Sequence, residues 1–291
     1  MKPEFPIFES LHIKHKSFME GFIEKFPPYS DYNFISLYSW NIDSDTEFSF
    51  LNGNLVIKMK DYIEDFHIYS FMGKKKPIHT ITRLLEFTDS LKLIPENSIS
   101  PALYDHHLFE VLEDKDNHDY IISLKSLSGL VGGEFKAKRK KVNKFLNKYP
   151  DHKIVELDLS KKIHAHDAID LIERWRVVRN KTKEEAEDER LAIERLISHY
   201  DNFDLMNLGV YNGNDLIGFT INEIAHGSMA IGHFGKSDTT FSGISTYMEH
   251  ITAKKLFDRG VEFLNLEQDL GLNGLRESKK SYRPVKFLKK Y

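Results

Sequence analysis

The sequence predicts an α/β protein made of two tandem lobes, each with a mixed, mainly antiparallel sheet flanked by helices. The chain has 291 residues, 41% of them hydrophobic, and at about 150 residues a domain this is enough for two compact units. Each half contains two alternating runs joined by an Asn/Gly turn, the pattern of a β-hairpin. In each half a third strand, a loop, a helix and a further strand follow. This order requires a parallel pair of strands within the sheet.

The first lobe is expected to span residues 1–150. Its first helix ends at Pro27-Pro28, and Ser30-Asp31 caps the next one. Asn52-Gly53-Asn54 forms the hairpin turn, and Pro150 ends a long basic helix. In chain order we predict helices at 17–26 and 33–40, strands at 47–51, 55–59 and 66–72, a helix at 78–91, strands at 99–104 and 120–123, and the basic helix at 134–149.

The second lobe is expected to span residues 151–291 and to hold the cleft in which the reaction takes place. Asn212-Gly213-Asn214-Asp215 forms its hairpin turn, and Gly260 ends a helix as a left-handed cap would. In chain order we predict helices at 164–179 and 183–200, strands at 206–211, 216–224 and 229–234, a helix at 245–259, a buried strand at 261–266, a helix at 272–280 and a strand at 285–288.

The composition excludes several classes of protein. The chain has no cysteine, which excludes disulfides, thiolate metal sites and a cysteine nucleophile. Its net charge of -3 does not by itself require a nucleic-acid or membrane partner. The start at Met1 lacks the apolar run of a signal peptide, and no stretch approaches about 18 consecutive apolar residues. We therefore expect a cytoplasmic protein with no transmembrane segment. Two pairs of histidines, His164 with His166 and His106 with His107, lack a third ligand at metal-binding spacing. We therefore expect no metal, and we expect no permanently bound cofactor.

The residues at 265–284 are the most informative segment. A hydrophobic strand is predicted to end in Glu267 and Asp269, one pleat apart and on the same face. A Gly-rich turn then opens a helix with a cationic face, to which Arg276, Lys279 and Lys280 contribute. Carboxylates beside such a helix suit an amine substrate or an anionic acyl carrier. The alternative is a set of internal salt bridges that holds the last helix to the sheet.

Four segments together resemble one protein family. The most specific is NLEQDLGLNGLRESKKSYRP at 265–284; the others are 29–34 with Trp40, 138–145, and 233–236 with Gly243. They resemble an uncharacterised bacterial family related to the catalytic, C-terminal domain of phosphatidylglycerol lysyltransferase. The resemblance covers nearly the whole chain. It implies two tandem GNAT-like (acyl-CoA N-acyltransferase-like) lobes that transfer an aminoacyl group from charged tRNA or an acyl group from acyl-CoA.

The resemblance also implies roles for single residues. Enzymes of this fold act by direct transfer, so Glu267 or Asp269 is expected to take a proton or hold an ammonium group, and Tyr282 to protonate the leaving group. A packing role is the alternative for Tyr282. Substrate contacts are expected from Arg276, Lys279, Lys280, His233 and Lys236. The chain departs from the family in lacking a membrane region, and in having Gly235 where an acidic residue is expected beside Phe234.

Two further segments suit an anionic ligand. The helix at 134–149 gathers many cations, including Lys138, Arg139 and Lys141, and its self-repulsion is offset if it binds a phosphate-rich partner such as tRNA or CoA. A solvated helix face is the alternative, and for the loop Lys74-Lys75-Lys76 it is the favoured one. Backbone N–H groups at Ser242, Gly243 and Ser245 are placed to hold the pyrophosphate of a cofactor.

The sequence therefore predicts an aminoacyl or acyl transferase that acts on an amine or hydroxyl acceptor. Two alternatives remain. One is a non-catalytic module that keeps this fold and binds an anionic ligand. Gly235 and the lone Gly243 favour this alternative. The other is a plain N-acetyltransferase for a small amine.

Overall fold

The computed structural model describes residues 2–291, apart from the side chains of residues 184 and 185, and Met1 lies outside the described residues. The chain forms two compact units. Unit 1 holds the chain up to Tyr120 together with Glu267–Tyr291, and unit 2 is Ile121–Leu266. These bounds differ from the predicted division at residue 150, because the C-terminal segment packs with the N-terminal part of the chain.

Unit 1 is built on an antiparallel sheet with the order β1-β2-β3-β4. The β2–β3 turn has positive φ at Asn52 and Gly53, as a tight hairpin turn requires, which confirms the predicted hairpin. The strands are β1 (Glu9–Ser10), β2 (Glu47–Leu51), β3 (Asn54–Lys60), β4 (His67–Met72) and β11 (Lys286–Leu288), the α-helices are α1 (Lys16–Ile23), α2 (Phe34–Ser39), α3 (Pro77–Leu84) and α9 (Asn273–Lys280), and 3-10 turns occur at Ile13–His15, Ser30–Tyr32, Glu96–Ser98, Pro101–Leu103 and Lys115–Asn117.

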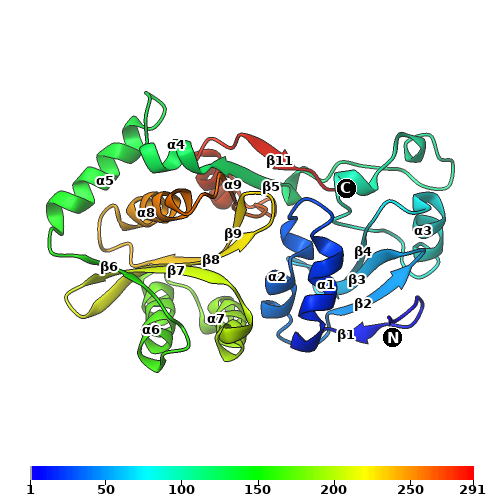
Figure 1. Cartoon of the computed structure of the whole chain (residues 1–291), viewed down its shortest axis with the longest axis horizontal. Coiled ribbons are helices and arrows are strands. Elements are labelled where there is room, and N and C mark those ends of the chain that lie inside the picture. Colours follow the sequence, from blue (N-terminus) through cyan, green and yellow to red (C-terminus); the bar gives the residue numbers. More distant parts are fainter. Residues whose placement is uncertain (1) are drawn as a thin grey trace. The chain divides into compact units, whose positions relative to one another are not determined.

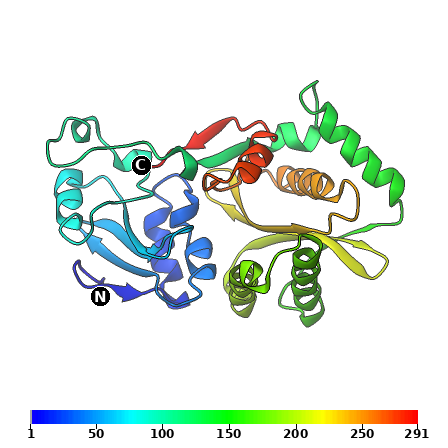
Figure 2. The same ribbon diagram turned by 180° about the vertical axis from the view of Figure 1, so that it is seen from behind.

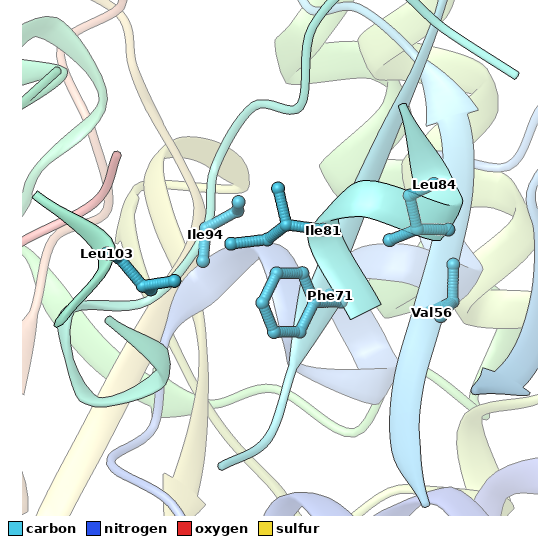
Figure 3. Close-up of a cluster of buried hydrophobic side chains, with 6 residues drawn as sticks. All are labelled: Val56, Phe71, Ile81, Leu84, Ile94 and Leu103. Atoms are coloured by element: carbon cyan, nitrogen blue, oxygen red, sulfur yellow. The ribbon is translucent and has the colours of Figure 1, made fainter. Parts of the chain in front are cut away.

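Helices cover both faces of this sheet, with α1 and α2 on one side and α3 on the other (Figure 1). On the α3 side, buried apolar side chains from β3, β4, α3 and the following loop form one cluster (Figure 3). Its members are Val56, Phe71, Ile81, Leu84, Ile94 and Leu103. Burial of each such side chain contributes about 1.5–3 kcal/mol, so this cluster stabilises the attachment of α3 and the loop to the sheet.

Two predictions for the first half are wrong. The strand predicted at 99–104 is instead a 3-10 turn at Pro101–Leu103, because Pro101 begins the turn and has no N–H to donate to a ladder. The helix predicted at 78–91 ends at Leu84. The expected parallel crossover is reduced to a single parallel bridge between Tyr69 and Leu91.

Unit 2 is built on a larger mixed sheet. The strand order is β11-β5-β10-β9-β8-β7-β6. Strand β5 (Asp119–Ser123) begins with residues of unit 1. There the ring of Tyr120 contacts the ring of Phe287 on β11. The other strands are β6 (Lys153–Glu156), β7 (Leu205–Asn212), β8 (Asp215–Ala225), β9 (Met229–Ser237) and β10 (Phe263–Asn265), the α-helices are α4 (Leu124–Gly129), α5 (Lys136–Lys148), α6 (Lys162–Val178), α7 (Lys183–Ser198) and α8 (Ile244–Asp258), and a 3-10 turn lies at Tyr200–Asn202.

The predicted crossover in the second half is confirmed. Strand β9 pairs antiparallel with β8 and parallel with β10, and α8 connects β9 to β10. Helix α8 covers one face of the sheet, and α6 and α7 cover the other (Figures 1 and 2). A Cβ atom at Gly218 of β8 would lie 2.8 Å from Met248 Cγ of α8. Glycine therefore allows α8 to approach the sheet closely.

The β8–β9 ladder contains a bulge. Ile221 pairs with Phe234 and Asn222 with Gly232, so His233 has no partner in the register. A bulge of this kind changes the direction of one side chain and bends the strand. The register shift thus sets the orientation of His233, one of the residues predicted to bind substrate.

Candidate functional site

The C-terminal segment leaves the strand with an unusual backbone. Strand β10 ends at Asn265 rather than Leu266, and Glu267, Leu270 and Gly271 all have left-handed φ values, of 58°, 55° and 73°. A residue other than glycine pays about 1–2 kcal/mol for this conformation. Such strain persists where the surrounding contacts fix the backbone, and it is concentrated at functional sites. Because the strand stops early, Glu267 and Asp269 are not one pleat apart and have different partners.

Asp269 is the most tightly held carboxylate of the segment. Its side chain is fully buried. The Tyr120 hydroxyl donates to Oδ2 at 2.5 Å, Arg276 donates to Oδ2 from Nε at 2.9 Å and to Oδ1 from a terminal nitrogen at 2.8 Å, and the Gly271 N–H donates to Oδ1 at 2.9 Å. Burial opposes the charge, but the hydrogen bonds from Arg276 and Tyr120 outweigh it and lower the pKa of Asp269 to about 2.

This geometry suits the ion-pair alternative for Asp269 and Arg276. Both carboxylate oxygens are occupied, and a carboxylate with a pKa of about 2 is a weak base at neutral pH. Arg276 also pairs with Asp116, so its guanidinium connects α9 to the turn before β5. The pair therefore fixes the position of α9 in unit 1.

Glu267 and Lys279 have a different environment. Glu267 is half-buried, and one of its carboxylate oxygens accepts a 3.4 Å hydrogen bond from the Ser36 hydroxyl. Lys279 donates to the backbone carbonyl of Gln268. Burial lowers the pKa of the Lys279 ammonium, although the charge of Glu267 opposes this change. Of the two predicted carboxylates, Glu267 is the one with an exposed surface.

Beneath this segment lies a buried charge cluster that the sequence analysis missed. Lys290 is fully buried, and its ammonium contacts Asp31 and lies 2.7 Å from an Asp119 oxygen. The Ser30 N–H donates to Asp119 at 2.8 Å, and the Ser30 hydroxyl lies 2.8 Å from the Gln268 amide oxygen. The cluster joins the Ser30-Asp31 run to the C-terminal run. Both runs belong to the segments that resemble the family. That resemblance was the signal in the sequence that could have pointed to this cluster.

The cluster shifts the pKa of its own members. Burial lowers the pKa of Lys290, but the charges of Asp119 and Asp31 more than offset this and raise it overall. Burial raises the pKa of Asp31 against the effect of Lys290. The Tyr62 hydroxyl donates to Asp31 at 2.8 Å, while the residue as a whole is 38% exposed. Tyr62 thus covers the cluster at the surface.

The last two predicted residues of the segment lie at the end of α9. Tyr282 follows the helix and is 7% exposed. Lys280 is exposed, near the C-terminal end of the helix. The structure therefore pairs Asp269 with Arg276 and places Lys279 on the Gln268 carbonyl of the same segment, whereas Lys280 is at the surface.

In unit 2, the bulge places His233 beside a carboxylate. The His233 side chain is almost fully buried, and its Nε2 lies 3.3 Å from an oxygen of Glu223 on β8. Lys236 also lies on β9. Its ammonium is 2.7 Å from Glu189 of α7 and 3.8 Å from the centre of the Trp175 ring on α6. Both predicted substrate residues are therefore held by internal contacts, and Glu223 was not foreseen from the sequence.

The basic helix and the predicted cofactor loop lie together in unit 2. Helix α5 packs on α8, and a Cβ atom at Gly243 would lie 2.5 Å from the backbone oxygen of Lys141. Lys141 and Ser245 are exposed there. Arg139 donates to the backbone oxygens of Leu130 and Gly132, so it holds the loop before α5.

Two acidic groups adjoin this region. Asp238 is buried; the Thr240 hydroxyl donates to it at 2.6 Å, and Arg174 lies 3.5 Å away. Glu249 of α8 has a buried oxygen with no hydrogen-bond partner among the described residues. Burial raises the pKa of Glu249 to about 8, although Lys138 and Lys141 act to lower it. The α5–α8 region thus combines exposed cations with one poorly solvated carboxylate.

Comparison with known proteins places the chain in a family. The sequence profile described as "Phosphatidylglycerol lysyltransferase, C-terminal" matches residues 24–291. The chain belongs to this family. The predicted resemblance is therefore confirmed. No curated protein matches the chain. Among residues 2–291, no helix is long and apolar enough to cross a membrane, and no group of three or more His, Asp or Glu side chains is arranged to hold a metal ion.

Solved structures share the fold. A conserved protein of unknown function from Bacteroides thetaiotaomicron is 26% identical, with a TM-score of 0.81 over 100% of this chain and 98% of that one. L-PGS from Bacillus licheniformis is 14% identical, with a TM-score of 0.61 over 94% of this chain and 90% of that one. These likenesses show the fold, and the predicted α/β class with mainly antiparallel sheets flanked by helices is confirmed. The mixed sheet expected in each lobe is found in unit 2, whereas the sheet of unit 1 is antiparallel.

Proposed function

We propose that this protein is a transferase that moves an aminoacyl group from charged tRNA, or an acyl group from acyl-CoA, to an amine or hydroxyl acceptor. Membership of the lysyltransferase family supports the reaction class. The observation that carries the proposal is the contrast between the two carboxylates of the C-terminal segment. Asp269 is saturated by four hydrogen bonds, whereas Glu267 stays partly exposed on a strained backbone.

In this proposal Glu267 accepts the proton of the attacking amine or hydroxyl. A bond forms between the acceptor atom and the acyl carbon, and the ester bond to tRNA or the thioester bond to CoA breaks. Tyr282 is the proposed donor of a proton to the leaving oxygen or sulfur, and the proton held by Glu267 returns through solvent to restore the Tyr282 hydroxyl. Asp269 and Arg276 hold α9 in place, and Lys279 lies beside Glu267 in the same segment.

Two lysines of α5, Lys138 and Lys141, are the proposed contact for the donor's phosphates. Lys141 is exposed, and its backbone lies against Gly243 at the start of α8, where Ser242, Gly243 and Ser245 offer backbone donors. Lys138 is half-buried on the same helix and acts on Glu249 of α8. Neutralising several phosphates makes binding fall steeply as salt rises. Alanine at both lysines is expected to weaken tRNA or CoA binding and reduce the salt slope, while Lys140→Ala on the same helix serves as the matched control.

The test of the reaction measures label transfer from a mixed aminoacyl-tRNA pool and from acetyl-CoA to cellular acceptors. Glu267→Gln is expected to reduce the rate about 100-fold or more, since a general base contributes about 10²–10⁴. Glu277→Gln, an exposed carboxylate on α9, is expected to leave it unchanged. The proposal is refuted if label is transferred neither from the aminoacyl-tRNA pool nor from acetyl-CoA.

A non-catalytic module that binds an anionic ligand is the second candidate. Gly235 favours it, because the position beside Phe234 has no acidic side chain. A Cβ atom there would meet only Thr220 Cγ2 at 3.6 Å and the Phe219 oxygen at 3.8 Å, which are ordinary contacts. Gly235→Glu therefore fits the fold. Transfer that arises only in this variant would indicate that the natural chain binds without catalysis.

A further inference from the structure

Unit 1 contains a pocket whose lining includes none of the residues proposed above for transfer or donor binding; of the segments named in the sequence analysis as suited to an anion, it includes Lys75 of the basic loop 74–76. It has a volume of about 420 Å³ and lies between the first residues of the chain, the end of α1 and the β2–β3 turn. This volume falls within the range of about 300–1,000 Å³ that is usual for small-molecule sites. We propose that this pocket binds a small organic dianion, a phosphate monoester that carries an aromatic or other apolar body.

The charge of the lining matches a dianion. Lys2, Lys25 and Lys75 contribute three positive charges and Glu4 one negative charge, which leaves two positive charges in excess. Within the described part of the chain, no carboxylate lies within ion-pair distance of these three ammonium groups. A phosphate monoester carries close to two negative charges above its second pKa of about 6. Charge-assisted hydrogen bonds from lysine to phosphate are the strong kind.

Lys2 and Lys25 are held by weak contacts. The Lys2 ammonium lies 4.8 Å from the centre of the Phe50 ring, and the Lys25 ammonium lies 5.7 Å from that of Phe22. Such cation–π contacts contribute about 0.5–1 kcal/mol at exposed sites, which is less than a hydrogen bond between charged groups. The two ammonium groups can therefore turn to a phosphate at little cost.

Lys75 is positioned in advance by the backbone. Its N–H donates to the side-chain oxygen of the fully buried Asn54 at 3.0 Å, and its carbonyl accepts from the Asn54 amide at 2.7 Å. The Lys75 ammonium lies over the hairpin turn, because a Cβ atom at Gly53 would be 3.2 Å from it. Gly53 has a φ of +78° and no side chain, so the turn leaves this space open.

The walls suit an apolar body. The rings of Phe22 and Phe50 meet edge to face, 5.6 Å apart at 78°, and both line the pocket. An aromatic group of the ligand can pack on such a pair, which inorganic phosphate cannot do. The lysines and phenylalanines of the lining thus select for a molecule that has both a phosphate group and an apolar body. This inference does not depend on the transfer reaction proposed above.

The test uses phenyl phosphate as the probe, titrated into the full chain at pH 8 by calorimetry. Inorganic phosphate supplies charge without a ring, and benzenesulfonate supplies a ring with a single charge. Phenyl phosphate is expected to bind at least tenfold more tightly than either. Lys25→Ala and Lys75→Ala should each weaken it about tenfold, and Phe22→Leu should weaken phenyl phosphate but not inorganic phosphate.

Lys74→Ala is the matched control, since Lys74 is exposed in the same loop but does not line the pocket. The Lys74→Ala variant should bind phenyl phosphate with the same affinity as the natural chain. Lys25 and Lys75 are exposed, so their variants are expected to fold, which a thermal melt checks. The inference is overturned if phenyl phosphate does not bind saturably, or if Lys74→Ala weakens binding as much as Lys75→Ala does.

Discussion

Two carboxylates only two positions apart in the chain, Glu267 and Asp269, differ in their hydrogen bonding because the backbone between them leaves the extended conformation. The left-handed φ of Glu267 turns its side chain toward Ser36, and the turn at Leu270 and Gly271 directs an N–H at Asp269. Sequence alone gives both residues the same role. The distinction depends on backbone dihedrals and on Tyr120, which is distant in the chain.

Asp269→Asn tests the structural role of this carboxylate. The amide keeps the shape, but its one oxygen replaces only one of the two carboxylate oxygens, each of which accepts two hydrogen bonds. The variant also leaves the Arg276 guanidinium without its buried negative partner. We expect the free energy of unfolding to fall by about 3 kcal/mol, measured by denaturant titration at pH 7. Glu277→Gln on the exposed side of α9 should stay within about 0.5 kcal/mol. A change of that small size in Asp269→Asn would contradict the role.

The same variant has a pH signature. The pKa of Asp269 is lowered from 3.8 to about 2, so the folded chain binds its proton less well than the unfolded chain does. The stability that this carboxylate contributes is therefore present above about pH 4 and lost as the pH falls through 4 to 2. Relative to the natural chain, Asp269→Asn should lose the most stability at neutral pH and little near pH 2.

At the scale of elements, α5 and α8 are held together at a glycine. A Cβ atom at Gly243 would lie 2.5 Å from the Lys141 oxygen, and its φ is +93°. Gly243→Ala must therefore place an alanine at an unfavourable left-handed φ, and its Cβ must also displace α5. Gly260→Ala has a similar φ of +84° but nothing within 4 Å, so it loses only the cost of the left-handed dihedral, about 1–2 kcal/mol. Thermal melts should show a larger loss for Gly243→Ala, and equal losses would contradict the close packing.

The α5–α8 contact also contains a titrating group. The pKa of Glu249 is raised from 4.5 to about 8, so the folded chain holds this proton more tightly than the unfolded chain. Stability from this group is present below about pH 4.5 and lost as the pH rises through 8. Glu249→Gln removes the charge, and its stability relative to the natural chain should increase from pH 5 to 8.5. Parallel curves for the two proteins over that range would contradict this.

Elements whose pattern is local were predicted well from sequence. The Asn-Gly turns placed both hairpins, and the alternation of β7, β8 and β9 placed the larger sheet. The segment at 99–104 was predicted wrongly, because its apolar residues allow a strand while Pro101 favours a turn. The bulge at His233 could not be predicted, since it depends on the register with β8. Local chemistry determines the elements, and pairing across the chain determines what each side chain meets.

At the scale of the whole molecule, the last residues of the chain are part of the core of unit 1. Lys290 stands next to the C-terminus, where chains commonly fray, yet it is fully buried between Asp31 and Asp119. These partners are separated from it by most of the chain, so no local pattern could have predicted the cluster. The first and last parts of the sequence are thereby folded as one unit.

Lys290→Met tests this closure. It leaves Asp31 and Asp119 buried together without a cation, and loss of one member of a buried charge group costs about 3–5 kcal/mol. Lys289→Met is the matched control, because the Lys289 side chain is 43% exposed and its ammonium pairs with Glu113. Denaturant titration should show a large loss of unfolding free energy for the first variant and less than about 0.5 kcal/mol for the second.

A triple variant distinguishes an electrostatic cause from a loss of packing. In Lys290→Met with Asp31→Asn and Asp119→Asn, no charge is left without a partner, and the amides can still accept hydrogen bonds from Ser30 and Tyr62. If buried charge is the cause, the triple variant should recover most of the stability that Lys290→Met alone loses, since a neutral replacement of a buried ion group is often tolerated. If the triple variant is no more stable than the single one, the cluster stabilises unit 1 through the packing of the Lys290 side chain instead.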